Sequence, residues 1–358
     1  MLHGPAAMGE PWQPQPQQQQ RLPGLGNASE PSAWPSAAGG PGTAAPGSDG
    51  GIGPGPGSEA GAGGAVSPWD IALCATGTAV AGENALVLAV LFYTPSLRAP
   101  MFLLIGSLAL ADLLAGLGLV ANFAVRYLLR PPSEAAELGA AGLLLAAFSA
   151  SVCSLLAITV DRYLSLYNAL TYHSERTLGF TCAMVLLMWL LCLGVGLLPL
   201  LGWNCLRDQS SCSILRPVTK DNAAVLAVTF LLLFALMMQL YLQICKIAFR
   251  HAQQIAVQHQ FIATAQATST RKGLSTLSLI LGTFALCWIP FAIYSLVADS
   301  SYPVVYTYSL ALPATCNSLI NPIIYAFRNP DIQKSLWLAC CGCIPSTFSS
   351  RPRTSSDV

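Results

Sequence analysis

Charged side chains are scarce in this chain: Asp, Glu, Lys and Arg make up 9% of its 358 residues, whereas 54% are hydrophobic. Soluble domains average about 25% charged residues, so the composition excludes an ordinary soluble protein. The net charge of +1 gives no electrostatic reason to expect a nucleic-acid partner. Histidine is rare too, and no long apolar stretch contains one, which argues against an intramembrane enzyme that uses a histidine base or a metal. The composition predicts a membrane protein without enzymatic activity.

The N-terminal region lacks a short basic and apolar leader, so the first long apolar stretch is expected to act as the insertion signal. Residues 1–67 are rich in Pro, Gly, Ala and Gln and have few branched aliphatic side chains. Such a segment buries too little apolar surface to offset the entropy of ordering, which predicts a disordered tail. Its sequon at Asn27 predicts glycosylation if the tail is extracellular.

Seven apolar stretches follow the tail, and each has the length of about 20 residues that spans a hydrocarbon core. They are residues 70–93, 100–129, 137–168, 179–202, 221–249, 272–298 and 304–327. Lys and Arg gather in the segments that lie inside if the N-terminus is outside, which favours that orientation. The predicted fold class is an all-α membrane protein, a seven-transmembrane-helix bundle over residues 68–328. No internal repeats or broken helices favour the alternative of a transporter.

Asp112 lies in the middle of the second stretch, where a bare carboxylate needs a partner. Ser151 lies toward the centre of the third stretch, and Asn317, Ser318 and Asn321 lie in the inner half of the seventh. These oxygen-bearing side chains predict a site for a hydrated sodium ion around Asp112. A purely structural hydrogen-bond network is the alternative. We predict no other cofactor or metal.

Two further groups of residues predict that the helix bundle can adopt two conformations. At the inner end of the third stretch, Asp161-Arg162-Tyr163 places a long cationic side chain that can pair with its neighbour or reach the cytosol. Pro290 and Pro322 each remove a backbone hydrogen bond and should kink their helices. Trp288 lies close to the first kink; Asn321 and Tyr325 flank the second. An ordinary salt bridge and purely structural prolines are the alternatives.

Markers in six of the stretches occur in a fixed order: Asn84, Asp112, Arg162, Trp189, Pro290 and Pro322. In this order they resemble the class A, rhodopsin-like G-protein-coupled receptors over about residues 68–345. The runs 82–87, 156–171 and 326–329 resemble the constitutively active orphan receptors numbered three, six and twelve of that class, and runs 172–176 and 342–346 are most similar to receptor twelve. The resemblance implies ligand-independent activation of the stimulatory G protein at the plasma membrane, a rise in cyclic AMP, and arrestins and receptor kinases as further partners.

Departures from the class pattern refine these expectations. Glu137 occupies the place of the usual cysteine at the outer end of the third helix, so Cys205 and Cys212 are expected to close a ring within one outer loop, as in lipid-sensing relatives. Two free thiols are the alternative. Leu144 replaces the aspartate of amine receptors, which makes a cationic amine an unsuitable ligand.

An apolar pocket floor is expected in the outer half of the bundle, and it favours a lipid-like ligand. Its predicted members are Leu144, Leu145, Phe148, Trp288, Phe291 and Ile293. Packing of the bundle is the alternative role for each of these side chains. Arg126, Arg216 and Lys220 are candidates to bind an anion at the rim of the pocket.

The resemblance also locates the expected coupling surface. Many receptors carry an acid twenty residues before the sixth-helix proline that restrains the motif arginine, but here Thr270 stands there, followed by Arg271 and Lys272. This absence predicts high basal signalling. Tyr241 is expected to reach toward Arg162 in an open state, and Leu170 to insert into the G-protein α subunit. A ligand-dependent lysophospholipid or sphingolipid receptor coupled to an inhibitory G protein is the alternative.

Residues 329–343 predict a short amphipathic helix lying on membrane lipids, and residues 344–358 a cytoplasmic tail. Cys340, Cys341 and Cys343 are predicted palmitoylation sites. Ser and Thr residues of the tail are candidate phosphorylation sites. The terminal Ser356-Asp357-Val358 predicts a ligand for a PDZ protein.

Overall fold

The computed structural model describes residues 66–129, 131, 133–167, 177–258, 263–299 and 301–341. Regular structure in these residues is helical, with only isolated β-bridges in the outer loops. The α-helices are α1 (Pro68–Tyr93), α2 (Pro100–Tyr127), α3 (Glu134–Tyr167), α5 (Leu178–Leu197), α6 (Lys220–Gln258), α7 (Ala263–Val297), α8 (Val304–Arg328) and α9 (Pro330–Cys341). Two 3-10 helices, η1 (Pro95–Leu97) and η2 (Gln209–Ser211), lie in loops. The predicted all-α fold class is confirmed.

Six of the described helices are long and apolar enough to cross a membrane: α1, α2, α3, α5, Lys220–His251 of α6 and Leu274–Val297 of α7. Helix α8 is not in that set, although its 25 residues reach about 37 Å at 1.5 Å per residue. Its polar side chains Asn317, Ser318 and Asn321 lower its average hydropathy, but they are buried in the bundle. Polar groups that face protein instead of lipid are compatible with a seventh span.

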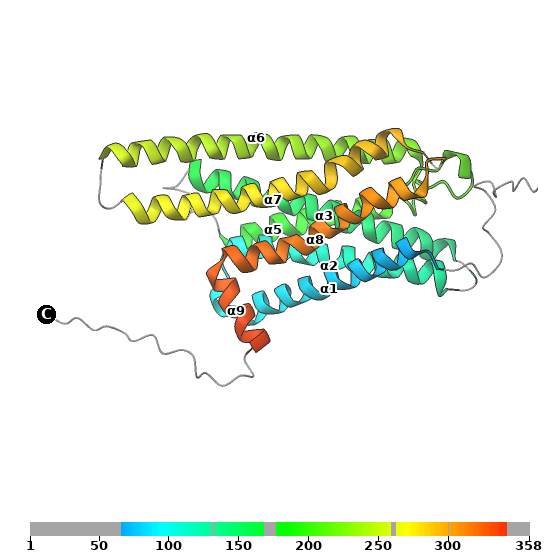
Figure 1. Ribbon diagram of the computed structural model, residues 1–358, viewed down its shortest axis with the longest axis horizontal. Helices are drawn as coiled ribbons and strands as arrows, with labels where there is room; N and C mark the ends of the chain where they lie inside the picture. The colour runs from blue at the N-terminus through cyan, green and yellow to red at the C-terminus, as the bar shows by residue number, and fades with distance from the viewer. Residues whose placement is uncertain are drawn as a thin grey trace, which may run out of the picture. The chain divides into compact units, whose positions relative to one another are not determined.

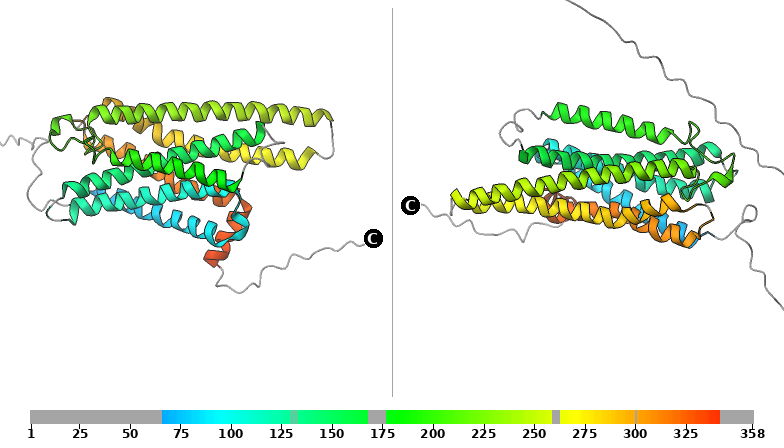
Figure 2. Two further views of the ribbon diagram at one scale, coloured as in Figure 1. Left: turned by 180° about the vertical axis from the view of Figure 1, so that it is seen from behind. Right: turned by 90° about the horizontal axis from the view of Figure 1, so that it is seen from above.

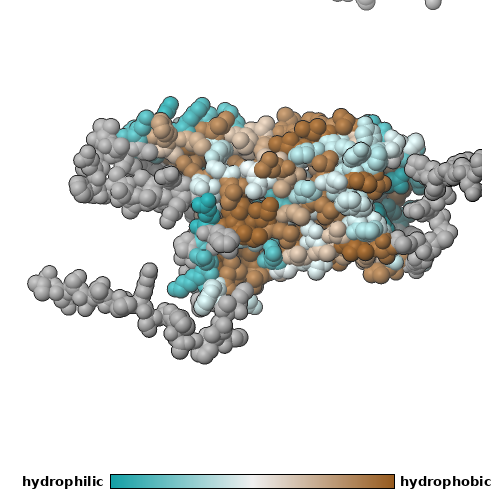
Figure 3. All heavy atoms as spheres, in the orientation of Figure 1, coloured by the Kyte–Doolittle hydropathy of each residue, from teal (hydrophilic) through white to brown (hydrophobic). Residues whose placement is uncertain are grey.

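The helices form a closed bundle in which α1 packs against α2 and α8, α2 against α3, α3 against α5 and α6, α6 against α7, and α7 against α8 (Figures 1 and 2). The short α9 turns away from the end of α8 and contacts both α8 and α1 (Figure 1). Apolar side chains cover much of the visible face of the bundle, and hydrophilic ones lie toward its ends (Figure 3). This distribution suits helices that are surrounded by lipid along their middle.

Local sequence signals account for several helix boundaries and bends. Pro68 and Pro100 begin α1 and α2, where a missing backbone N–H costs no hydrogen bond. The Thr177 hydroxyl caps α5 by accepting from the Phe180 N–H at 3.2 Å. Pro290 and Pro322 lie inside α7 and α8 as expected, and α7 changes direction along its course in Figure 1.

Glycines set the closest approach between α3 and α5. A Cβ atom added to Gly142 would lie 2.3 Å from the carbonyl oxygen of Gly196, and one added to Gly196 would lie 2.7 Å from the Cβ of Ala146. The two backbones are therefore in direct contact, as small residues allow in membrane helix pairs. This contact brings Cys192 of α5 into a small buried cluster with Ala150 of α3.

Candidate functional site

Asp112 of α2 is the centre of a buried polar cluster. Its carboxylate accepts hydrogen bonds from the Ser151 hydroxyl of α3 at 3.0 Å, from the Ser318 hydroxyl of α8 at 2.9 Å and from the Asn321 amide at 2.9 Å. Asp112 itself is 0% exposed. The cluster joins three helices at one depth, and the structure brings together four of the residues that the sequence analysis assigned to this site.

Several buried amide atoms of α1 and α8 have no hydrogen-bond partner in the part of the chain that the structure describes. Among the described residues, the buried side-chain atoms without a hydrogen bond are Asn84 Oδ1, Asn317 Nδ2 and Oδ1, and Asn321 Oδ1. The Asn84 amide donates to the Ser318 carbonyl at 3.2 Å, which ties α1 to the cluster. Buried polar atoms are normally satisfied by protein, water or an ion. The Asn321 amide that donates to Asp112 also carries an unpaired oxygen, and carboxylate and amide oxygens are ligands that fit a small hard cation with its water.

Trp288 of α7 is surrounded by aromatic rings from three helices. Its ring centroid lies 5.0 Å from that of Phe148 of α3 in an edge-to-face arrangement, and 6.2 Å from that of Phe291. Phe230 of α6 and Phe284 of α7 lie 5.9 and 6.1 Å away. The structure thus brings together the three predicted aromatic residues of the pocket floor. It adds two phenylalanines that sequence reasoning missed.

The aliphatic residues assigned to this floor are placed differently. Leu144 packs against Gly118 of α2, because a Cβ there would lie 2.8 Å from its side chain, and Leu145 is half-buried. The assignment of Ile293 is wrong: it is 52% exposed. Ile293 follows Phe291 by two positions, which is about 200° around the helix, so the side chains of Phe291 and Ile293 point in opposite directions.

At the inner end of the bundle, the guanidinium of Arg162 contacts the sulfur of Met101 at the start of α2. Asp161 beside it is buried. The hydroxyl of Tyr241 on α6 forms a hydrogen bond with that of Ser278 on α7. Arg162 is therefore directed toward α2, and Tyr241 links the inner parts of α6 and α7.

The family model described as "7 transmembrane receptor (rhodopsin family)" matches residues 83–325, a range that includes the Asp112 cluster, Trp288 and Arg162. The chain belongs to the rhodopsin family of seven-transmembrane receptors. It is 66% identical over 293 residues to G-protein coupled receptor 12 of Mus musculus (82% of this chain, 87% of that one). G-protein coupled receptor 6 of Rattus norvegicus is 54% identical over 294 residues (82% and 80%), and G-protein coupled receptor 3 of Rattus norvegicus 53% over 290 (81% and 88%).

These comparisons confirm the predicted resemblance to the group of orphan receptors three, six and twelve, with identity highest to receptor 12 among the three. Membership of this family makes the chain a multi-pass membrane receptor that works with G proteins, not an enzyme.

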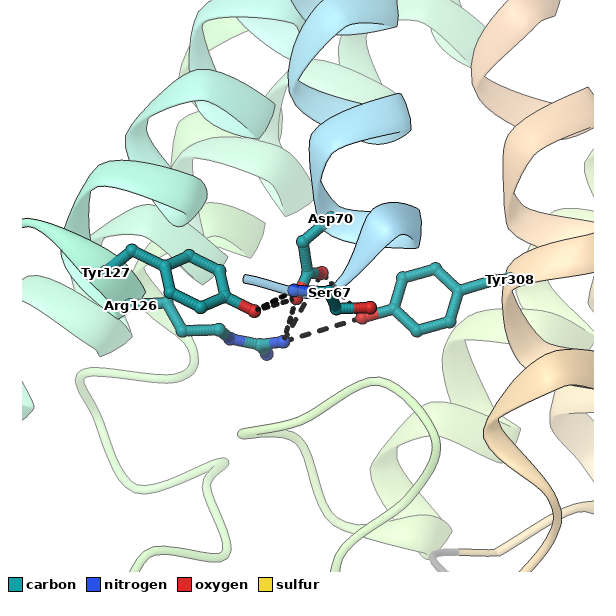
Figure 4. A network of polar contacts seen from close by, with 5 residues as sticks. All are labelled: Ser67, Asp70, Arg126, Tyr127 and Tyr308. Carbon is teal, nitrogen blue, oxygen red and sulfur yellow. Dashed lines mark hydrogen bonds and ion pairs between the residues drawn. The ribbon is translucent and has the colours of Figure 1, made fainter. Parts of the chain in front are cut away.

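The outer end of the receptor holds a network that sequence reasoning missed (Figure 4). Asp70, near the start of α1, accepts hydrogen bonds from the hydroxyls of Tyr127 and Tyr308, both at 2.6 Å, and pairs with Arg126 at 3.2 Å. Asp70 is only 7% exposed. The network ties together the outer ends of α1, α2 and α8. An acid at the very start of the first apolar stretch was the available signal, but nothing in the sequence identified its partners.

Two of the three cations considered for binding an anion at the rim are paired within the receptor. Arg126 is bound by Asp70, and Lys220 lies 3.7 Å from Asp299. Hydrogen bonds from Ser301, together with the nearby Lys220, lower the pKa of Asp299, so it is a carboxylate at neutral pH. Arg216 lines a small cavity with Glu137 and the Cys205–Cys212 disulfide, whose two cysteines are buried. Because an acid lines the same cavity, anion binding by Arg216 stays a prediction.

The remaining predicted sites lie at or beyond the edges of the described chain. Thr270 lies in α7, Pro322 and Tyr325 in α8, and Cys340 and Cys341 at the end of α9. Asn27, Leu170, Cys343 and the tail residues 344–358 lie outside the described residues. Glycosylation, palmitoylation and binding of arrestins, receptor kinases and a PDZ protein stay predictions from the sequence.

Proposed function

We propose that this receptor activates the stimulatory G protein without added ligand and so raises cyclic AMP, acting in the plasma membrane with its N-terminus outside. The observation that carries the proposal is the lack of an acid at the inner end of α7. Thr270 takes the place of the restraining acid, and Arg271 and Lys272 follow it. Neither threonine nor a cation can form an ion pair with Arg162, so this segment offers no electrostatic attraction that would hold α7 against α3.

The contacts at the inner end agree with a weak restraint. The Arg162 guanidinium contacts the neutral Met101 of α2, and Tyr241 ties α7 to α6 through Ser278. Outward movement of α7 would therefore break no ion pair between residue 270 and Arg162, because residue 270 is an uncharged threonine. Since about 1.4 kcal/mol corresponds to a tenfold change in an equilibrium, losing even one ion pair shifts the fraction of active receptor noticeably.

A lipid-like ligand is the class that the Trp288 cluster favours. The side chains around Trp288 are aromatic, and Leu144 takes the place where an aspartate would bind an amine. Apolar walls with few polar groups recognise hydrocarbon better than a peptide or a sugar. Such a ligand would act on a receptor that already signals.

The decisive experiment measures cyclic AMP in cells that express the receptor in serum-free, delipidated medium. We expect cyclic AMP to rise in proportion to the amount of receptor at the cell surface. A fall below the level of untransfected cells, measured after direct stimulation of adenylate cyclase, would instead identify the alternative of a receptor coupled to an inhibitory G protein. No change in either direction would also contradict ligand-independent signalling.

We also propose that the Asp112 cluster holds a sodium ion, with Asp112, Ser151, Asn317 and Ser318 as the residues that supply oxygens and Asn321 supporting the carboxylate. The bound cation would neutralise the buried carboxylate and satisfy amide oxygens that now lack partners. It would stabilise the arrangement in which α2, α3 and α8 meet.

Replacing Asp112 with asparagine is expected to abolish sodium-dependent stabilisation of the purified receptor. In the wild type, exchanging a large organic cation for sodium at the same ionic strength should raise the thermal midpoint by about 2–6 °C, a stabilisation of roughly 1–2 kcal/mol by a ligand in excess of its dissociation constant. Asp299→Asn, a change at a loop acid, serves as the control and should keep the full shift. A sodium shift that survives Asp112→Asn would exclude this site.

A further inference from the structure

The carboxylate of Asp70 on α1 is held by donors that lie on two other helices. The Tyr308 hydroxyl of α8 donates to Oδ1 and the Tyr127 hydroxyl of α2 donates to Oδ2, both at 2.6 Å. Nη1 of Arg126 lies 3.5 and 3.2 Å from the same two oxygens. The three side chains approach Asp70 from two sides (Figure 4). Each carboxylate oxygen therefore meets one hydroxyl, and the guanidinium contacts both.

This arrangement differs from the other outer ion pair of the described chain. Lys220 and Asp299 make a single contact of 3.7 Å, and both side chains are exposed, as in an ordinary surface pair. At the Asp70 network the acid side chain is 9% exposed, whereas that of Arg126 is 48% exposed. The carboxylate is thus enclosed by charge-assisted hydrogen bonds, while the cation beside it can still be reached from the outer solution.

The donors are also positioned by contacts that do not involve the Asp70 carboxylate. The Tyr308 ring stacks on that of Trp69, with centroids 5.8 Å apart. The Tyr127 ring lies 4.9 Å from that of Phe123, one turn earlier on α2, and its hydroxyl accepts from the Ser67 N–H at 3.4 Å. Donors that are held in place before the anion arrives bind it more tightly. We therefore expect the three donors to keep their arrangement when the carboxylate is removed.

We propose that Arg126, Tyr127 and Tyr308 form a binding site for a monocarboxylate, and that Asp70 occupies this site as a built-in ligand. Because Asp70 is tethered through α1, its effective concentration at the site is high, and a free acid does not displace it. The role of Asp70 rests on the ligand-independent signalling proposed above. Its carboxylate joins the outer ends of α1, α2 and α8 as the acid group of a bound ligand would, and no ligand is then required.

Replacement of the missing carboxylate by acetate tests the site. Asp70→Gly removes one methylene and one carboxylate, which together have the size of an acetate ion. In the purified full-length receptor this change should lower the thermal midpoint by about 3–8 °C. Sodium acetate should restore at least half of the loss, with a half-maximal effect on the order of 10 mM, since a free ion must give up its translational freedom. Sodium chloride at the same ionic strength and the neutral acetamide should restore none of it.

Two further variants show whether acetate binds at the three donors. Asp299→Gly removes an acid that has one cation and no tyrosine around it in the described chain, so acetate should not change its midpoint. Tyr308→Phe, added to Asp70→Gly, removes one donor to the anion. The acetate concentration for the half-maximal effect should then rise about tenfold, because a charge-assisted hydrogen bond is lost. The wild type, whose site is filled by Asp70, should not respond to acetate.

Basal cyclic AMP tests the role of Asp70 as a built-in ligand. At equal surface expression, Asp70→Gly should lower the basal level roughly threefold or more, and acetate in the medium should raise it again, with untransfected cells as the control for acetate itself. Basal cyclic AMP that stays at the wild-type level in Asp70→Gly would overturn this role. A midpoint that responds to acetate no more than to chloride would overturn the site.

The thermal measurement also separates this inference from the proposed function. A wild-type receptor without basal cyclic AMP would contradict ligand-independent signalling and with it the signalling role of Asp70, whereas the acetate shift would still decide whether the site exists. If Asp70→Gly does not fold, Asp70→Ala with sodium formate takes its place, because alanine leaves room for the carboxylate group alone. Formate should then restore the midpoint, and the absence of any restoration would overturn the site.

Discussion

Replacing Thr270 with glutamate is expected to lower basal cyclic AMP at equal surface expression. The new carboxylate would offer Arg162 an ion pair between the inner ends of α3 and α7. A partly buried pair of ~1–2 kcal/mol raises the ratio of inactive to active receptor by about five- to thirtyfold. The Arg162 guanidinium would have to leave the sulfur of Met101. Because sulfur is a weak hydrogen-bond acceptor, losing this contact costs little free energy. Cyclic AMP per surface receptor, measured without serum, gives the readout.

Thr268→Glu is the matched control for this experiment. It adds the same charge to the same helix. Residue 268 precedes residue 270 by two positions, which is about 200° around α7, so the new carboxylate points away from the side of the helix that carries residue 270. Basal signalling should stay near the wild-type level. If Thr270→Glu leaves cyclic AMP unchanged as well, the missing ion pair does not explain basal activity, even where that activity is real. Equal losses in both variants would point to a general effect of charge.

Much of the fold was predictable because membrane insertion imposes strong rules on sequence. The long apolar stretches predicted the membrane-spanning helices, and the polar residues within them predicted the cluster around Asp112. Ser151, Ser318 and Asn321 all donate to Asp112 as their positions suggested. Asn317 was assigned to the same cluster, yet both of its polar side-chain atoms lack partners. Helical periodicity assigns a residue to a face, but it does not fix which amide completes a hydrogen bond.

The outer network was not predictable from sequence for a geometric reason. Asp70 meets Tyr127 and Tyr308, which lie 57 and 238 residues further along the chain. Such contacts depend on how three helix ends converge, and no local pattern encodes that. The error at Ile293 has a different origin, because counting residues around the helix from Phe291 would have placed it on the opposite face.

The sequence also did not show which glycines lie at a contact between helices. Gly139 and Gly142 both lie in the outer half of α3, one turn apart, and the sequence does not distinguish them. In the structure, a Cβ on Gly139 would meet no atom within 4 Å, whereas one on Gly142 would lie 2.3 Å from the Gly196 carbonyl oxygen. The difference arises from where α5 crosses α3.

Replacing Gly142 with alanine is therefore expected to destabilise the receptor, and valine at this position more so. The added methyl group would meet the backbone of Gly196, which cannot rotate away as the tip of a side chain can, so α3 and α5 must separate. Overpacking of this kind costs about 1–3 kcal/mol. Separation would also open the cluster around Cys192, which is 2% exposed in the intact bundle. Thermal unfolding of purified receptor, followed by the reaction of buried thiols with a fluorogenic maleimide, measures both effects.

Gly139→Ala provides the control on the same helix. Without a clash, alanine should stabilise the helix by about 0.5–1 kcal/mol relative to glycine, so its thermal midpoint should equal or exceed that of the wild type. The two alanine variants differ by one methyl group placed one turn apart, and they should shift the midpoint in opposite directions. Equal midpoints would mean that the α3 and α5 backbones are not in contact at Gly142. A midpoint lowered by Gly139→Ala alone would place the crossing of the two helices one turn nearer the outer end of α3.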